Sequence, residues 1–337
     1  MMTIFVVLLP ILLGVAALAV DLGGYAGHRR SLQNAADSIA LAASRDLPDA
    51  TAAQTTAQAY TTKAGLSWSD VTFTVIPQSA SNPNPKVSVD IARPHGFAFM
   101  RALGVGSATV RAHAAAIKTS PGGGPRLTPW AVTQTTVQNT TPGSTVTLKY
   151  DATNPTTGNF GAIQIDGPGA SVYGATVDNG SSTTACAQNV TTCTSTSPVC
   201  SSGSCPSQTG NMVGPTRAAV DYLIANTDSR CDTFDEVFSG PVNGKYTLNN
   251  QCNPWLASSY RSLRVIILPI ITSLCNGNCS LTVVGFALFW LDGYPNGQCT
   301  GNSCLIQGRF VSSDLTVNAV AGVFDPNSLI HFTRLSE

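Results

Sequence analysis

The chain begins with an uncharged apolar segment. Residues 3–20 read TIFVVLLPILLGVAALAV and contain no charged side chain. At the standard helical rise, a run of this length forms a helix of about 27 Å, close to the thickness of the hydrocarbon core of a bilayer. Pro10 and Gly14 are both tolerated in membrane helices. The pattern therefore predicts a transmembrane helix over about residues 3–20.

Two observations leave alternatives to this anchor open. Residues 17–19 (ALA) offer a small-x-small cleavage site, although no basic residue precedes the apolar run as a signal peptide requires. The nearby positive side chains, His28, Arg29 and Arg30, all follow the run, so the positive-inside rule favours a cytoplasmic C-terminus. A short basic leader ahead of the first residue would remove this conflict.

A helical pattern continues directly beyond the apolar run. Residues 25–46 contain no Pro and few Gly, and Pro48 is expected to end the helix. Apolar side chains recur on one helical face at intervals of three and four residues, at Leu32, Ala35, Ala36, Ile39, Ala40 and Ala43. We therefore expect residues 1–46 to form one long helix, a membrane anchor that runs on into an amphipathic part, and we expect this face to contact the helices of other subunits.

The next segment predicts a small α+β region over residues 47–118. A Pro-free stretch rich in Ala and Thr predicts a helix, and alternating polar and apolar residues predict strands. The expected order is a helix at 49–64, strands at 70–78 and 86–92, a short helix at 97–103 stopped by Gly104, and a strand, or less favourably a helix, at 107–118. Such an order packs as a layer beside the long N-terminal helix.

The remainder of the chain predicts a second, mostly-β domain over residues 127–337. Residues 119–126, which include PGGGP, have the composition of a linker. The apolar runs at 265–271 and 281–291 are too short to span a bilayer as helices and are typical of strands buried on both faces. Gly214-Pro215 predicts the start of a helix. We expect a barrel or sandwich with one or two helices, and hence an α+β protein overall.

The ten cysteines all fall in this second domain. Their even number and their restriction to residues 186–304 indicate a disulfide framework, which persists in an oxidising compartment. Zinc is the alternative, but the spacings include no CxxC pair and no His lies among them. Bonds between neighbours in the sequence are favoured, although spacing does not fix the pairing: Cys186 with Cys193, Cys200 with Cys205, Cys231 with Cys252, Cys275 with Cys279 and Cys299 with Cys304.

Charge and motifs argue against nucleic-acid binding and catalysis. The chain has 18 basic and 18 acidic residues, so no net charge attracts nucleic acid. It has no HExxH, Walker A, GxGxxG or GxSxG motif, and we expect no catalytic residue, cofactor or metal. The sequences that follow Asp166 and Asp178 resemble an adhesion-type cation site only weakly. Asp21, at the expected membrane exit with Arg29 and Arg30, is either a solvated charge or a partner for a basic group of another subunit.

The N-terminal residues resemble a known family. Residues 9–47 read LPILLGVAALAVDLGGYAGHRRSLQNAADSIALAASRDL, with a Leu-Pro inside the apolar run, a Val-Asp-Leu-Gly exit, a basic pair and LQNAAD before an Ala-rich stretch. This combination is similar to the N-terminal signature of the TadE/TadG-like proteins of the tight-adherence (Flp) pilus system. The resemblance implies a pilin-like protein of the bacterial envelope that helps to build or stabilise a surface pilus.

Two functions follow as hypotheses. The first is a membrane-anchored, minor-pilin-like assembly protein without catalysis, whose partners are the cytoplasmic membrane and other pilin-like or Tad secretion-platform proteins. The second is a surface adhesin or ligand-binding module carried by the Cys-rich domain. An exported hydrolase is the least favoured class, because no nucleophile and base pair up in the sequence. In both leading hypotheses, one helix crosses the membrane and the rest of the chain lies outside the cytoplasm.

Overall fold

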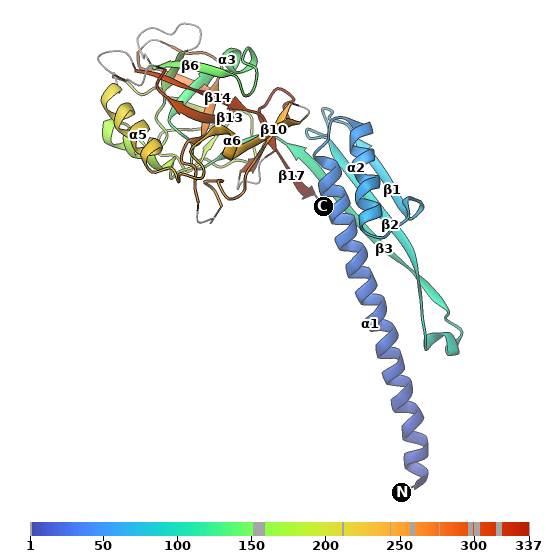
Figure 1. The fold of residues 1–337 in the computed structure, drawn as a ribbon. Helices are drawn as coiled ribbons and strands as arrows, with labels where there is room; N and C mark the ends of the chain where they lie inside the picture. The colour runs from blue at the N-terminus through green and yellow to red at the C-terminus, as the bar shows by residue number, and fades with distance from the viewer. Residues whose placement is uncertain are drawn as a thin grey trace. The chain divides into compact units, whose positions relative to one another are not determined.

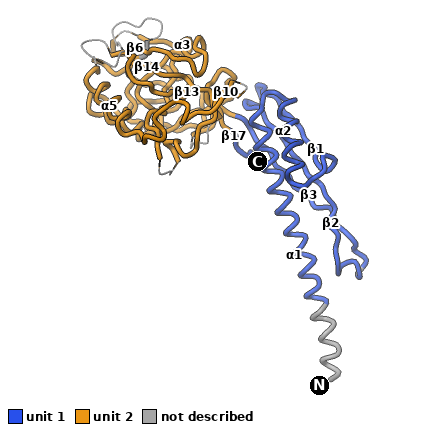
Figure 2. Tube along the Cα trace, in the orientation of Figure 1, with its two compact units in different colours: residues 1–118, 333–337 blue, residues 119–332 orange. Residues whose placement is uncertain are grey.

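The chain folds into two compact units. Unit 1 comprises residues 1–118 and 333–337, and unit 2 comprises residues 119–332 (Figure 2). The computed structural model describes the backbone of residues 2–150, 159–210, 212–242, 244–256, 260–275, 277–295, 299, 304–314 and 319–336, and their side chains except at 2–13, 103, 149, 150, 159 and 160. The expected α+β class is confirmed, with a long N-terminal helix packed on a sheet followed by a β-rich unit.

Unit 1 is built on one long helix. Helix α1 runs without a break over Met2–Ser44, and a short turn containing Pro48 leads to α2, Ala50–Lys63. The Asp49 side chain caps α2 by accepting hydrogen bonds from the backbone N–H groups of Thr51 and Ala52, at 2.9 and 3.0 Å. Both helices cover the same face of a sheet (Figure 1).

That sheet has the strand order β1-β2-β3-β17 within unit 1. Strands β1 (Val71–Ile76), β2 (Lys86–Gly96) and β3 (Ser107–Thr119) are antiparallel neighbours, and the end of β17 (Ile330–Ser336) lies beside β3. Alternate residues of β2, namely Val87, Val89 and Ile91, are buried under the helices. The alternation therefore places one face of the sheet in the core, as the sequence pattern predicted. A 3₁₀ turn, η2 (Met100–Leu103), closes the β2–β3 hairpin and ends at Gly104.

Unit 2 contains a closed barrel. Its main sheet has the order β12-β5-β7-β6-β14-β13-β9, and a further pairing of β12 with β13 joins the two sides of a six-stranded ring. Closure removes the free edges that an open sheet would expose. The ring strands are β5 (Trp130–Thr133), β6 (Thr145–Tyr150), β7 (Asn159–Ala162), β12 (Val265–Ile271), β13 (Ser280–Gly293) and β14 (Cys304–Val311), and β9 (Ser204–Pro206) extends β13.

The two long apolar runs form the centre of this barrel. All seven residues of β12 are buried, and its side chains alternate between two apolar clusters. Phe286, Leu288 and Trp290 of β13 belong to one cluster, while Phe289 and Leu291 belong to the other. The prediction of strands buried on both faces is thus confirmed.

Shorter elements complete unit 2. A small sheet has the order β16-β4-β8, and three further helices and a hairpin pack around the barrel. These elements are β4 (Pro121–Gly124), β8 (Ala185–Cys186), α4 (Ala170–Asn179), α5 (Val213–Ala225), α6 (Phe234–Val237), β10 (Phe238–Val242), β11 (Lys245–Leu248), β15 (Ser313–Asp314) and β16 (Val320–Ala321).

Three local expectations differ from the structure. The PGGGP stretch, expected in a linker, forms strand β4; glycine is needed at position 122, because a Cβ there would lie only 2.8 Å from the Cα atom of Gly322. Thr133 caps a short helix, α3 (Gln134–Gln138), which was not among the expected elements. Helix α4 was not predicted, because its Ser, Thr and Gly residues make the apolar periodicity difficult to recognise in the sequence.

Candidate functional site

The apolar face of α1 forms the core of unit 1. Leu32, Ala36, Ile39, Ala40 and Ala43 are at most 2% exposed, and Ala35 packs against them. They contact α2 and the covered face of the sheet, because Ala side chains let the helices approach closely. This face was expected to contact the helices of other subunits, but in the structure it is buried within the chain's own fold.

Asp21 ties α1 to the tip of the β2–β3 hairpin. Its carboxylate is 5% exposed and accepts hydrogen bonds from the backbone N–H groups of Ala98, Phe99 and Met100, at 2.9, 2.8 and 2.6 Å. Burial by itself raises the pKa of Asp21, but the three backbone bonds and the nearby His95 outweigh it and lower the pKa below the ordinary value of 3.8. Asp21 is therefore a structural clamp within unit 1, and neither the solvated charge nor the partner contact expected from the sequence.

Aromatic rings gather next to this clamp. His95 lies 5.3 Å from the ring of His28, 5.5 Å from that of Phe97 and 6.0 Å from that of Tyr25. Burial lowers the pKa of His28, and the charges of His95 and Arg93 lower it further. His28 Nδ1 is buried and has no hydrogen-bond partner among the described residues. Arg29 and Arg30, the other residues expected at the membrane exit, are exposed.

Lys118 fixes the other end of α1. Its side chain is buried, and its Nζ donates hydrogen bonds to the backbone carbonyls of Arg45 and Leu47, at 2.7 and 2.8 Å. A cation is favourable at the C-terminal end of a helix, where carbonyl groups lack helical partners. Sequence reasoning missed this contact, although a Lys at the end of an apolar strand was a visible signal.

Unit 2 is cross-linked by five disulfides. The bonded pairs are Cys186–Cys193, Cys200–Cys205, Cys231–Cys252, Cys275–Cys279 and Cys299–Cys304. No cysteine is free to hold zinc, and the described residues contain no group of three His, Cys, Asp or Glu side chains placed to bind a metal. The disulfides indicate that unit 2 lies outside the cytoplasm.

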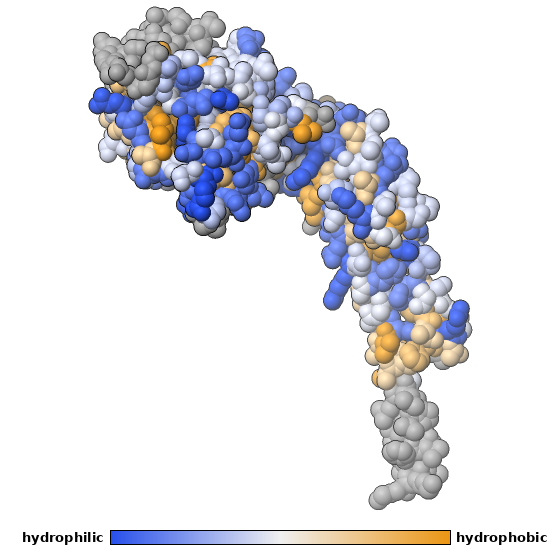
Figure 3. All heavy atoms as spheres, viewed as in Figure 1, coloured by the Kyte–Doolittle hydropathy of each residue, from blue (hydrophilic) through white to orange (hydrophobic). Residues whose placement is uncertain are grey.

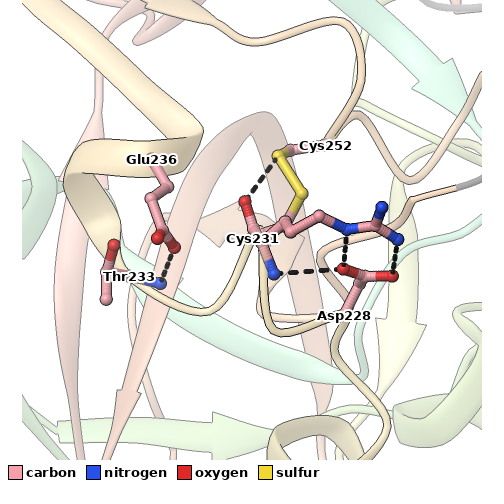
Figure 4. A network of polar contacts seen from close by, with 6 residues as sticks. Asp228, Cys231, Thr233, Glu236 and Cys252 are labelled. Carbon is pink, nitrogen blue, oxygen red and sulfur yellow. Dashed lines mark hydrogen bonds and ion pairs between the residues drawn. A yellow bond between two sulfur atoms is a disulfide. The ribbon is translucent and has the colours of Figure 1, made fainter.

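Charged side chains order the turns around one of these disulfides. The Asp228 carboxylate accepts two bonds from the Arg230 guanidinium, at 2.8 and 2.9 Å, near Cys231–Cys252 (Figure 4). The bonds from the side chain and then the backbone N–H of Arg230 lower the pKa of Asp228 to about 2. Glu236 accepts a bond from the backbone N–H of Thr233 at 3.1 Å (Figure 4). These are structural contacts, and no nucleophile lies beside a base among them.

A polar cavity in unit 2 is the main candidate for ligand binding. It has a volume of about 450 Å³, and its lining includes Asp178, Arg126, Arg261, Trp255 and Tyr222. Asp178 Oδ1 is buried with no hydrogen-bond partner among the described residues, and burial raises the pKa of Asp178. A carboxylate, guanidinium groups and aromatic rings together suit a polar, hydroxyl-bearing ligand.

Asp166, the second acidic residue considered in the sequence, has a structural role. Its carboxylate accepts hydrogen bonds from the backbone N–H groups of Ser182 and Thr183 at 2.9 and 3.1 Å. The Thr183 and Thr176 hydroxyls donate to it as well, at 2.6 and 3.3 Å. Asp166 and Asp178 do not converge on one cation site.

The membrane segment is only partly covered by the structure. Within the described residues, no helix is both long enough and apolar enough to cross a bilayer. Most of the span expected at residues 3–20 lies outside the residues whose side chains the structure describes. The backbone of this segment is helical and continuous with the rest of α1.

Comparison with known families identifies the N-terminal part. Residues 1–59 match the family model Tad, described as Flp pilus-assembly TadE/G-like. This stretch is therefore similar to a Tad domain. The match covers α1 and most of α2, which is the segment whose sequence resembles this family. The chain matches no curated protein and no solved structure. The Tad domain suggests a role with the machinery of Flp pilus assembly.

Proposed function

We propose that the chain is a membrane-anchored, minor-pilin-like protein that assembles or stabilises a tight-adherence (Flp) pilus, without catalysis. The observation that carries this proposal is the unbroken helix α1. It joins the uncharged run of residues 3–20 to the core of unit 1, all within the segment that matches the Tad family. A cleaved leader has no reason to share one helix with the folded core.

The proposed location is the cytoplasmic membrane, crossed once, with both units outside the cytoplasm. Two features support this location: the length of the uncharged run, and the five disulfides of unit 2, which need an oxidising compartment. The disulfides weigh more than the basic residues after the run, because all ten cysteines are bonded.

Contacts with other pilin-like or secretion-platform proteins must use a part of α1 that the chain leaves open. Ala26, Arg30, Asn34 and Ser38 follow one another at four-residue intervals and are exposed. This side of the helix is exposed, whereas the Ala-rich face is buried. We place the partner contact here.

Piliation tests the proposal. In cells lacking the protein, the wild-type chain should restore surface pili, as should Leu12→Ile. Leu12→Arg, at the centre of the uncharged run, should not, because an arginine costs about 2.5–3.5 kcal/mol at the centre of a membrane helix. Asn34→Trp should also reduce piliation, whereas Thr74→Trp, on the open face of the sheet, should not. Normal pili in cells lacking the protein would end the proposal.

A second candidate function is binding of a surface ligand by unit 2, in the role of an adhesin. The observation that favours it is the cavity with the unpartnered Asp178 carboxylate oxygen. Asp178→Asn and Trp255→Ala should then abolish adhesion while pili remain. Loss of pili in the same variants would favour a role of unit 2 in assembly.

A further inference from the structure

The tip of the β2–β3 hairpin exposes large apolar side chains. Residues 97–105 read FAFMRALGV, and Phe99 and Val105 are 50% and 42% exposed. The opposite end of the same sheet, the β1–β2 turn at residues 79–85, reads SASNPNP and is polar. Exposed aromatic and aliphatic side chains concentrated at one loop tip indicate an interaction site.

Asp21 determines where this tip lies along α1. Its three hydrogen bonds to Ala98, Phe99 and Met100 hold the tip against the helix at the first residue after the uncharged run of 3–20. The neighbouring helical residues Leu18 and Leu22 are exposed too. Figure 3 shows apolar residues gathered around the hairpin tip and this part of the helix. The tip is therefore level with the end of the apolar run, and the two form one continuous apolar surface.

Basic side chains accompany this surface. Residues 14–34 and 91–112, which form this end of unit 1, contain five arginines and a single acidic residue, Asp21, which is buried. Arg101 lies within the tip and is exposed, as are Arg29 and Arg30 on the helix. Apolar residues flanked by arginines match the boundary between acyl chains and anionic head groups in a bilayer.

We propose that the hairpin tip, residues 97–105, inserts into the interfacial layer of the same bilayer that holds α1. The proposal rests on the membrane anchoring proposed above and adds a second point of contact. A single helix leaves the exported unit free to swing about its exit point. A helix and a loop tip, held together by Asp21, fix the orientation of unit 1 on an anionic lipid surface.

Photo-crosslinking in the full-length chain tests this contact. A photoreactive benzoylphenylalanine replaces Phe99 in one variant and Ile76 in the control. Ile76 is 37% exposed, comparable with Phe99, but lies at the other end of the sheet, where it pairs with Lys86. Both chains are reconstituted in vesicles of phosphatidylethanolamine and phosphatidylglycerol, isolated by flotation, and irradiated.

The expected result is severalfold more lipid adduct from position 99 than from position 76. Flotation of both variants with equal, low lipid adducts would overturn the tip contact and leave the anchor intact. Adducts from position 99 to a second protein chain would also overturn it, and would make the tip a protein contact. Failure of either chain to float would overturn the anchor and the tip contact together.

Discussion

Asp21 Oδ2 lies 2.6 Å from the backbone nitrogen of Met100, a residue 79 positions further along the chain. This bond and its two companions connect the long helix to the hairpin tip through a buried carboxylate. A charge is stable there because three backbone N–H groups solvate it. The contact holds the hairpin tip against α1.

Replacing Asp21 by Asn should release the tip. An amide offers one acceptor oxygen, so at least one backbone N–H would lose its partner. We expect hydrogen exchange of the amides of residues 98–100 to accelerate by about tenfold or more, since local opening becomes easier. The matched control is Asp37→Asn, on the same helix, where the carboxylate binds only the neighbouring Gln33 side chain. Unchanged exchange at 98–100 in Asp21→Asn would contradict the clamp.

His28 should make unit 1 less stable in mild acid. Its folded-state pKa lies below 6.5, chiefly because of burial, and the charges of His95 and Arg93 lower it further; Lys63 lines the same cavity. As pH falls below about 6.5, the unfolded chain binds a proton before folded His28 does, so stability is complete above that pH and declines below it. The melting temperature should fall less between pH 7 and pH 5 in His28→Gln than in the wild type. An equal fall in both would argue against His28 as the source.

The disulfide with the longer loop should stabilise unit 2 more. Cys231–Cys252 spans 21 residues and Cys200–Cys205 spans 5, and all four cysteines are buried in the same apolar cluster. Restriction of the unfolded chain predicts losses of about 3 and about 2 kcal/mol respectively for the two double Cys→Ser variants. Thermal unfolding of the full chain compares them directly. A larger loss for the short loop would show that local packing decides their contribution.

Arg264 should be needed for the barrel wall. Its guanidinium donates bonds to the carbonyls of Leu291 and Asp292, at 2.8 and 2.9 Å, and stacks on the ring of Trp290 at 4.8 Å. Arg264→Met leaves these carbonyls without donors and should lower the free energy of unfolding by about 2–4 kcal/mol. The neighbouring Arg261 is exposed, and Arg261→Met should change stability by less than about 0.5 kcal/mol. Similar effects in both variants would contradict this assignment.

Features set by neighbouring residues could be predicted from the sequence. The long helix with its Ala-rich face, the alternating strands and the two fully buried runs follow from periodicity, which is local. The prediction that this helical face contacts other subunits was wrong. An apolar stripe shows that the face is covered, but it does not show whether the same chain or another one covers it. In the fold, α2 and the sheet cover this face, through residues such as Ala57, Val89 and Ala112.

Features set by distant contacts could not be predicted. Closure of the barrel depends on the parallel contact of β12 with β5, which pairs Ile270 with Val132 across more than a hundred residues. The Asp21 clamp, the Lys118 contact and the cavity around Asp178 likewise join segments far apart in the chain. A lone acidic or basic residue beside an apolar segment was the sole sequence signal for the first two.

The most direct test of the account is the accessibility of the cysteines in intact cells. A membrane-impermeant maleimide is applied to whole cells with and without prior reduction. We predict labelling without lysis, and only after reduction, because all ten cysteines are disulfide-bonded and unit 2 lies outside the cytoplasm. Labelling that needs lysis and no reduction would place unit 2 in the cytoplasm, and would contradict both the exported location and the proposed role at the pilus.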